Sequence, residues 1–247
     1  MRVAILTDIH GNWHALGSVL TDLRRVAPDV TVFAGDVALF GSAPTRCWDA
    51  VHDAGWPIVQ GNTDRYIFDL DGKLATMPPE NQAVREALRA GITWVRAEMG
   101  QERVAQLGGM AKRFDIAAPA GAVLVVHGSL GNDEVGFARF EPDTAFAARL
   151  PEPAPDVLVC GHTHTAFVRT VGRTLLVNCG SIGRTYDGIP GIATYAVLDD
   201  ASGRWSATIQ RVPYPNKDAY DALRNSSAPV SETVGASLLT GRIPDAE

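Results

Sequence analysis

The sequence predicts an α/β fold built around a parallel sheet. Three apolar runs near the N-terminus, residues 3–6, 30–34 and 57–60, have the length and composition of buried strands. Segments 13–26 and 44–54 follow the first two runs and read as helices, the second with Pro44 in its first turn and Gly55 at its end. Repeated strand and helix units of this kind form parallel sheets through right-handed crossovers.

The rest of the chain adds an insertion and further strands. Apolar residues spaced by three and four over residues 80–108 predict an amphipathic helical insertion, which fits equally well a cap that helps select substrate and a helix that only packs on the sheet. Strands are expected at 113–117, 123–126 and 156–160, as a hairpin at 167–171 and 174–177, and at 193–198 and 205–212, with short helices at 143–150 and 218–223.

Length and composition favour one domain. The 247 residues fit a single α/β unit, which we place at residues 1–224. Residues 225–247 are rich in Ser, Gly and Pro and are expected to be a C-terminal tail. This tail would be held either on the body of the domain or on a neighbouring copy of the chain, so a homo-oligomer stays open.

Charge and cysteine content narrow the partners and the compartment. A net charge of −6 gives no basic surface, so nucleic acid is disfavoured as a partner, and an anionic substrate would need metal cations to attract it. The three cysteines suggest no disulfide framework. No apolar run reaches the length of a membrane span, and the N-terminal run is too short for a signal peptide. We therefore expect a cytoplasmic protein with no membrane partner.

Polar residues suited to metal binding follow the predicted strands. Residues two apart in extended backbone point the same way, so the two histidines of Gly161-His162-Thr163-His164 can face one site. Taken alone, such a pattern is more typical of surface histidines in a turn. However, seven candidate ligands follow five predicted strands, and the carboxyl ends of parallel strands share one edge. These are Asp8, His10, Asp36, Asn62, His127, His162 and His164.

The number and types of these ligands indicate two metal ions. Imidazole, carboxylate and amide ligands suit Mn, Fe, Ni or Zn. Seven exceed what one tetrahedral site uses, whereas two ions that share a carboxylate would use them all. A pair of ions roughly 3.5–4 Å apart activates water and stabilises both oxygens of a phosphoryl displacement. The predicted chemistry is phosphoester hydrolysis.

The order of the motifs resembles that of a known family. Asp8-Ile9-His10, Gly35-Asp36, Gly61-Asn62-x-Asp64, His127-Gly128 and Gly161-His162-Thr163-His164 resemble the five motifs of the calcineurin-like metallophosphoesterases, over roughly residues 1–198. The resemblance implies a four-layer α/β/β/α sandwich of two mixed sheets with the site at the strand ends.

The resemblance also implies roles for the individual residues. One divalent ion would be held by Asp8, His10 and His164 and the other by Asn62, His127 and His162, with Asp36 bridging. A hydroxide between the ions would attack phosphorus in line. We expect Asp36, Asn62, Asp64 and His127 to be the catalytic residues, Asp64 as a group that orients ligands or the reacting phosphate.

Two departures from the family pattern bear on the substrate. Thr63 stands where most of the family has the histidine of the third motif, and a threonine hydroxyl is a poor general acid. In this the chain resembles small bacterial and archaeal phosphodiesterases of the family. Leu39-Phe40 replaces the Asp-Arg pair of phosphoprotein phosphatases and symmetrical dinucleoside tetraphosphatases, so those classes are disfavoured.

We therefore predict a metal-dependent hydrolase of small phosphodiesters. Asn12, Thr63 and Arg184 are the candidate substrate-binding residues, although a surface position for Arg184 fits the sequence equally well. A phosphomonoesterase or nucleotide pyrophosphatase on the same centre is the first alternative. A non-catalytic scaffold that binds proteins is the second.

Overall fold

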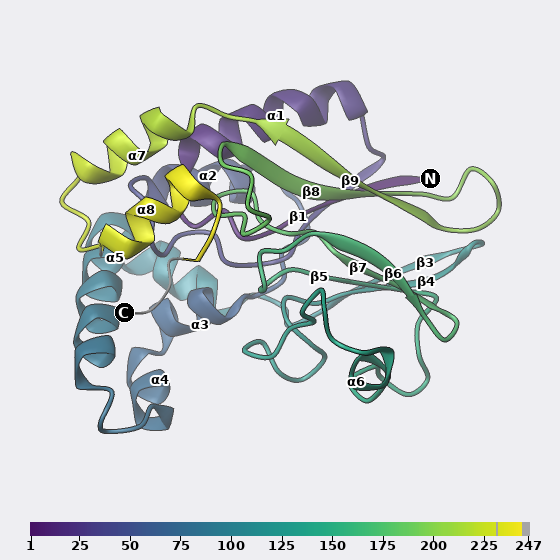
Figure 1. The fold of residues 1–247 in the computed structure, drawn as a ribbon, viewed down its shortest axis with the longest axis horizontal. Coiled ribbons are helices and arrows are strands. Elements are labelled where there is room, and N and C mark those ends of the chain that lie inside the picture. Colours follow the sequence, from purple (N-terminus) through teal and green to yellow (C-terminus); the bar gives the residue numbers. More distant parts are fainter. Residues whose placement is uncertain (231, 244–247) are drawn as a thin grey trace.

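Two mixed β-sheets form the centre of the molecule (Figure 1). The computed structural model describes residues 1–230 and 232–243. One sheet has the strand order β2-β1-β8-β9 and consists of β1 (Arg2–Leu6), β2 (Val30–Phe33), β8 (Ile192–Asp199) and β9 (Ser206–Pro213). The other has the order β3-β4-β5-β7-β6 and consists of β3 (Phe114–Ala118), β4 (Gly121–Val125), β5 (Val157–Cys160), β6 (Phe167–Val171) and β7 (Thr174–Asn178).

The loops that hold the candidate site residues follow the parallel strands of both sheets. β1 pairs in parallel with β2, and β5 pairs in parallel with β4 on one side and β7 on the other. The antiparallel strands β8, β9, β3 and β6 flank these parallel sets. The loops that follow β1, β2, β4 and β5 consequently meet at one end of the two sheets.

Apolar side chains fill three spaces between four layers. In β1, Ala4 and Leu6 face the helical layer and pack with Leu16 and Val19. Val3 and Ile5 point the other way, into the space between the sheets. The helices α1 (Trp13–Val26) and α2 (Pro44–Asp53) lie on the outer side of the first sheet, and α6 (Asp143–Ala147) covers the second. The expected four-layer α/β/β/α arrangement is confirmed.

Three helices form an arm at the end of the sheets where the loops after β1, β2, β4 and β5 meet. It consists of α3 (Asn62–Phe68), α4 (Leu70–Thr76) and the long α5 (Gln82–Gly108), which lie together in Figure 1. The helix α5 corresponds to the predicted insertion, with an interruption at Gly100, where φ is 77°. Neither α3 nor α4 was expected from the sequence. None of the helices in the described part of the chain has the length and apolar character needed to cross a bilayer.

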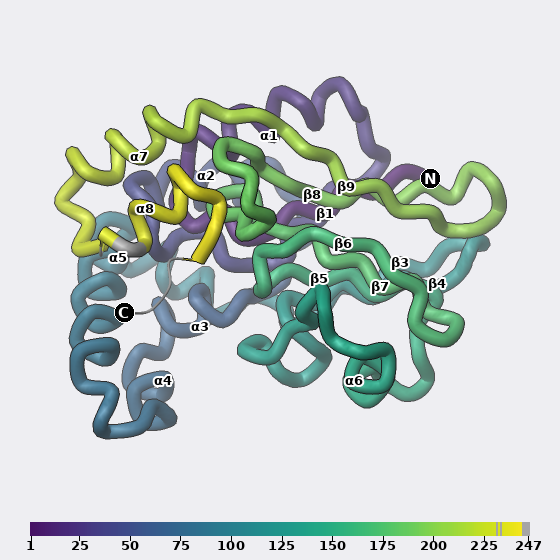
Figure 2. Tube along the Cα trace, viewed as in Figure 1, coloured from purple at the N-terminus to yellow at the C-terminus, as the bar shows by residue number. Residues whose placement is uncertain are grey.

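The C-terminal segment differs from the expected tail. The helix predicted at 218–223 is present as α7 (Asn216–Arg224), and the expected tail at 225–247 contains α8 (Glu232–Thr240). The chain trace in Figure 2 shows the two helices side by side. Ser237 and Leu238 of α8 are buried, so this helix packs on the body of the domain. Residues 231 and 244–247 of the expected tail lie outside the described residues.

The predicted third strand at residues 57–60 is also corrected. Only isolated parallel bridges form there, Ile58 with Phe33 and Val59 with Ala111. Pro57 has no backbone N–H to donate, so the segment cannot extend the ladder in that direction. The other predicted strands, including the hairpin of β6 and β7, are present.

Candidate metal centre

Seven side chains converge where the parallel strands end. Asp8 and His10 follow β1, Asp36 follows β2, His127 follows β4, and His162 and His164 follow β5. Asn62 comes from the first turn of α3. All are buried except His162, which is partly exposed. The structure thus brings together every ligand that the sequence predicted.

The backbone turns sharply at five of these positions. Asp8, His10, Asp36, His162 and His164 have φ between 49° and 66°, in the left-handed region that residues with a side chain seldom adopt. Such strain persists only where the surrounding structure enforces it, and it clusters at functional sites. Here it bends each chain immediately beyond its strand, so that the side chains face a common centre.

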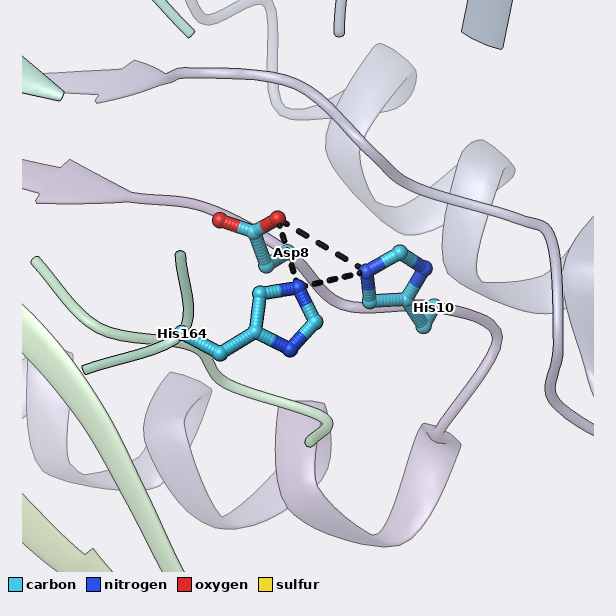
Figure 3. Close-up of side chains that lie close together, drawn as sticks. All are labelled: Asp8, His10 and His164. Atoms are coloured by element: carbon cyan, nitrogen blue, oxygen red, sulfur yellow. Dashed lines mark hydrogen bonds and ion pairs between the residues drawn. The ribbon is translucent and has the colours of Figure 1, made fainter. Parts of the chain in front are cut away.

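The first half of the centre consists of Asp8, His10 and His164, as Figure 3 shows. The Nε2 atoms of the two histidines are 3.1 Å apart. Asp8 Oδ1 lies 3.1 Å from His164 Nε2 and 3.6 Å from His10 Nε2. Within the described residues, Asp8 Oδ1 is buried without a hydrogen-bond partner.

Hydrogen bonds on the far side of each ring fix the tautomers in this half. His10 Nδ1 lies 3.0 Å from the Leu39 carbonyl oxygen, and His164 Nδ1 lies 2.7 Å from that of Arg184. A carbonyl oxygen can only accept, so each neutral ring donates through Nδ1 and keeps a lone pair on Nε2. Two lone pairs and an unpaired carboxylate oxygen then face one another. Only a cation satisfies this arrangement, so these residues fit a metal ion.

The second half of the centre consists of His127, His162 and Asn62, and its two rings are held in the same way. His127 Nδ1 donates to the Ala34 carbonyl at 2.8 Å, and His162 Nε2 donates to the Glu134 carbonyl at 3.1 Å. The other nitrogen of each ring faces Asn62 Oδ1, at 3.0 Å from His127 and 2.9 Å from His162. When both rings are neutral these atoms are again acceptors gathered without a donor, an arrangement that a proton on His127 or a second cation satisfies.

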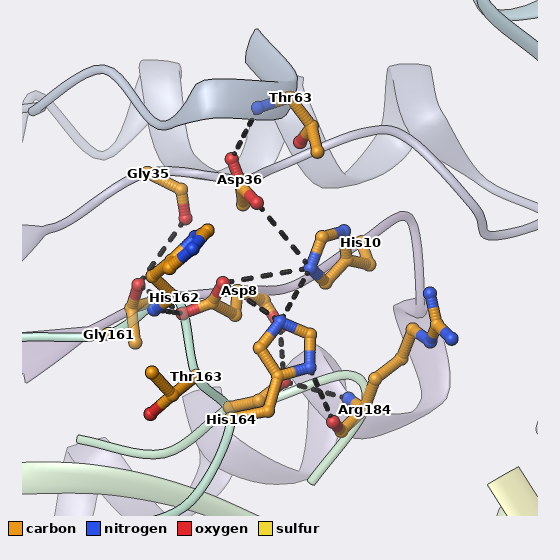
Figure 4. A network of polar contacts seen from close by, with 12 residues as sticks. Asp8, His10, Gly35, Asp36, Thr63, Gly161, His162, Thr163, His164 and Arg184 are labelled. Carbon is orange, nitrogen blue, oxygen red and sulfur yellow. Dashed lines mark hydrogen bonds and ion pairs between the residues drawn. The ribbon is translucent and has the colours of Figure 1, made fainter. Parts of the chain in front are cut away.

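Asp36 lies between the two halves. Its Oδ2 is 3.7 Å from His10 Nε2 and 3.5 Å from His127 Nε2. Its Oδ1 accepts the backbone N–H of Thr63 at 2.9 Å, as Figure 4 shows. Asp8 belongs to both groups of potential metal ligands, once with His10 and His164 and once with Asp36 and His127. Carboxylates at this place can therefore reach toward both cation positions.

The electrostatic field of the centre favours positive charge. Burial lowers the pKa of His127, but the carboxylates of Asp36 and Asp8 outweigh burial and raise the pKa to about 10. Burial raises the pKa of Asp36, yet the charge of His127 and its hydrogen bond lower it to about 2. The two aspartates thus remain ionised at neutral pH and hold either a proton on His127 or a metal ion in its place.

Asp64 does not point into the centre. Its carboxylate accepts three backbone N–H groups, from Asp36 at 2.8 Å, Val37 at 3.0 Å and Gly61 at 3.0 Å. Burial, followed by the charge of Asp36, raises the pKa of Asp64 to about 7. The side chain therefore ties the loop after β2 to the start of α3, and so fixes Asp36 and Asn62 relative to each other.

The three candidate substrate-binding residues have different surroundings. Asn12 caps α1 by accepting the Ala15 N–H and donates to the Gly183 carbonyl. The Thr63 hydroxyl is buried and has no hydrogen-bond partner in the described part of the chain. Arg184 is only 9% exposed, contrary to a surface position, and its guanidinium lies over the ring of Phe40 with Nη2 3.4 Å from Ser237 of α8.

Two aromatic rings beside the metal ligands were not identified from the sequence. Tyr186 stacks on His164 with 4.7 Å between ring centroids, and Phe40 tilts against His10 at 5.8 Å. Both residues lie in irregular segments, where no periodicity signals a side-chain direction. Only the position of Phe40, four residues after Asp36, could have suggested that it lies near the centre.

Comparison with known proteins agrees with this geometry. Residues 1–203 match the profile of the calcineurin-like phosphoesterase superfamily domain. An uncharacterized protein of Methanocaldococcus jannaschii is 24% identical over 263 residues, which cover 97% of this chain and 98% of that protein.

Two crystal structures share the fold over nearly their whole length. A metallophosphoesterase from Sphaerobacter thermophilus has a TM-score of 0.73 and 24% identity, with 98% of this chain and 100% of that one covered. A hypothetical protein from Pyrococcus horikoshii has a TM-score of 0.80 and 18% identity, with 97% and 98% covered.

Proposed function

We propose that this chain, which belongs to the calcineurin-like phosphoesterase superfamily, hydrolyses phosphodiesters with the help of two divalent metal ions. The observation that carries the proposal is the pair of acceptor-only clusters on either side of Asp36. Each cluster gathers lone pairs and carboxylate oxygens without a donor, and one residue reaches toward both. One buried proton cannot satisfy both clusters.

In this proposal Asp8, His10 and His164 would hold one ion, and Asn62, His127 and His162 would hold the other. Asp36, which lies between the two groups, would serve both. The donor set of imidazole nitrogen, carboxylate and amide oxygen suits Mn, Fe, Ni or Zn. When bound, the ions would activate a water molecule and neutralise charge on the phosphoryl oxygens.

The protein's own contribution is to hold these ligands rigidly. Each metal-facing histidine donates its other N–H to a backbone carbonyl, an arrangement that fixes ring orientation. The backbone N–H of Thr63 donates to the Asp36 carboxylate, and Asp64 accepts the backbone N–H of Asp36. We assign Asp64 and Asn12 to positioning, since their polar atoms are engaged by the backbone. Arg184, a buried cation beside the centre with no carboxylate partner among the described residues, is the candidate phosphate contact.

The residue Thr63 is the reason to expect diesters rather than monoesters as substrates. Its hydroxyl is buried and is too weak an acid to protonate a leaving group at neutral pH. We therefore expect diesters or activated esters, whose leaving groups need little protonation, to be preferred. A phosphomonoesterase or nucleotide pyrophosphatase on the same centre is the alternative. Comparable turnover of an alkyl monophosphate and an aryl diester would favour it.

Replacing Asp36 by Asn tests the enzyme proposal against a non-catalytic scaffold. We expect Asp36→Asn to abolish diester hydrolysis, because both halves of the centre lose a shared charge. Asp71→Asn, at an exposed position of α4, is the matched control and should keep full activity. Activity should be measured with Mn, Ni, Fe and Zn against diesters, monoesters and cyclic nucleotides. Unchanged hydrolysis by Asp36→Asn with confirmed metal content would refute the mechanism.

We also propose a cytoplasmic location. Cys47, Cys160 and Cys179 are free and buried, as expected in a reducing compartment. Recovery of the protein outside the cytoplasm after cell fractionation would contradict the proposed location.

The net charge of −6 does not oppose binding of a small anionic substrate, because its phosphate would meet the metal ions first.

A further inference from the structure

An apolar pocket of about 400 Å³ lies beside the metal centre. Its walls are the loop after β2, the helices α3, α4 and α5, and the segment that leads into α8. Phe40, Tyr66, Leu88 and Trp94 give it three aromatic rings and an aliphatic side. Val84, which is 59% exposed, lies at its rim. No motif in the sequence pointed to this pocket, because its walls come from segments far apart in the chain.

The pocket adjoins both halves of the metal centre. Phe40 lines the pocket and contacts the ring of His10, and Leu39, also in the wall, accepts the N–H of His10 Nδ1 through its carbonyl. On the other side, Tyr66 lines the pocket and lies on α3, four residues after Asn62 and so on the same face of that helix. Phe40 and Gly41 of its wall also line a small cavity that has His10 and Arg184 in its own wall, so the pocket and the His10 side of the centre share walls.

The chemistry of the walls selects an uncharged occupant. Lys73 is the one charged residue among the described lining residues, and its Nζ is paired with Glu134 at 2.6 Å. It also lies over the Tyr66 ring, 4.4 Å from the centroid. A charged group in the pocket would find no free partner, whereas an apolar group would gain by leaving water.

A second pocket at the metal centre has mostly polar side chains in its wall. It has a volume of about 670 Å³, includes His127 in its wall, and is lined by groups such as Ser129, Asn132 and Lys112. The two pockets therefore offer different environments to the two ester groups of a diester. An apolar ester group would favour the side of Phe40 and Tyr66.

We infer that this apolar pocket, hereafter the aryl pocket, binds an uncharged aryl or alkyl ester group of the substrate. The substrate class is then a phosphodiester with at least one apolar ester group. This inference rests on the proposed phosphodiesterase function and adds to it the part of the molecule that selects the substrate. It also gives the helical insertion α5 a role in specificity.

The test fills the pocket without touching the metal ligands. Ala87 lies on α5, is exposed and lines the aryl pocket, so Ala87→Trp should occupy it. Ala90 is exposed on the same helix but is not part of the pocket wall, so Ala90→Trp is the matched control. Gly91→Ala is a milder variant, because its new Cβ would lie 3.6 Å from Leu39 Cδ1, an ordinary contact.

The substrate is bis(4-nitrophenyl) phosphate, and inorganic phosphate is the competitor that needs only the metal centre. We expect Ala87→Trp to raise KM for the diester about tenfold, the scale of discrimination that apolar pockets achieve. The inhibition constant of phosphate should stay the same. Gly91→Ala should raise KM by about twofold to fivefold, and Ala90→Trp should change neither constant.

A titration of 1-naphthol into the metal-free protein gives a readout that needs no catalysis. Wild type and Ala90→Trp should bind it with equal affinity, and Ala87→Trp should bind about tenfold more weakly. If Ala87→Trp binds naphthol weakly but keeps the wild-type KM, the aryl pocket does not serve the substrate and the inference is overturned, while the phosphoesterase proposal stands. If wild type hydrolyses no ester with any metal, both fall together.

Discussion

Gly35 is the position at which backbone geometry and metal binding depend most directly on each other. It follows β2, precedes Asp36, and has φ of 95°, a conformation that L side chains rarely adopt. A Cβ added there would lie 2.5 Å from Gly61 N, 2.7 Å from Gly61 Cα and 2.9 Å from His127 Nδ1. In Gly35→Ala the methyl group would therefore push apart the loops that carry Asp36, Asn62 and His127.

The size of the effect follows from two contributions. The left-handed backbone costs an alanine about 1–2 kcal/mol. The clash with packed backbone and a buried ring adds about 1–3 kcal/mol. Gly35→Ala should thus lower the free energy of unfolding by about 2–5 kcal/mol. Displacing His127 from the Ala34 carbonyl disturbs a partner that orients a metal ligand, a change that typically weakens metal binding about 10–100-fold.

Gly131→Ala is the matched control. Gly131 has φ of 82°, but a Cβ there would meet no atom within 4 Å. It should show only the backbone contribution of about 1–2 kcal/mol and unchanged metal affinity. Urea unfolding of the metal-free proteins gives the first quantity, and calorimetric titration with Mn²⁺ gives the second. Equal stability losses and equal affinities in the two variants would refute the reasoning.

Two further predictions concern the histidines. Because the carboxylates of Asp36 and Asp8 raise the pKa of His127 from 6.5 to about 10, its charge stabilises the metal-free fold fully below pH 6.5, and this stabilisation is lost as the pH rises through about 10. Thermal unfolding across this range should show the loss in wild type but not in His127→Gln, and parallel curves would contradict it. Since His162 and His164 lie in different halves of the centre, His162→Ala and His164→Ala should each bind one metal ion per chain instead of two. Elemental analysis checks the stoichiometry, and a folded single variant that keeps both ions or loses both would disprove the division.

The sequence was sufficient to predict the positions of most strands and the candidate ligands of the centre. Short apolar runs followed by Asp or His are local signals, and the edge shared by parallel strands converts them into a common site without further information. Asp8, His10, Asp36, His127 and the His162-Thr163-His164 segment all follow this rule.

The short helices of the arm depended on distant parts of the chain. In α3 and α4, each of seven residues, the terminal carbonyls are satisfied from α5: Arg96 donates to the carbonyls of Ile67 and Phe68, and Arg85 to those of Leu74 and Met77. Helices this short are unstable alone, so their own sequence carries little signal. Placing Asn62 on a helix rather than in a loop therefore required the tertiary structure.

The sequence by itself thus determined which residues could bind metal and that they would gather at one edge of the sheets. Only the tertiary structure decided how they are held and what lies around them. The Asp64 carboxylate accepts three backbone N–H groups. The helix α8 contacts Arg184 through Ser237, which lies more than 50 residues further along the chain. The reason is physical: strand ends are set by local periodicity, whereas the partner of a buried polar group and the walls of a pocket exist only after the chain has folded.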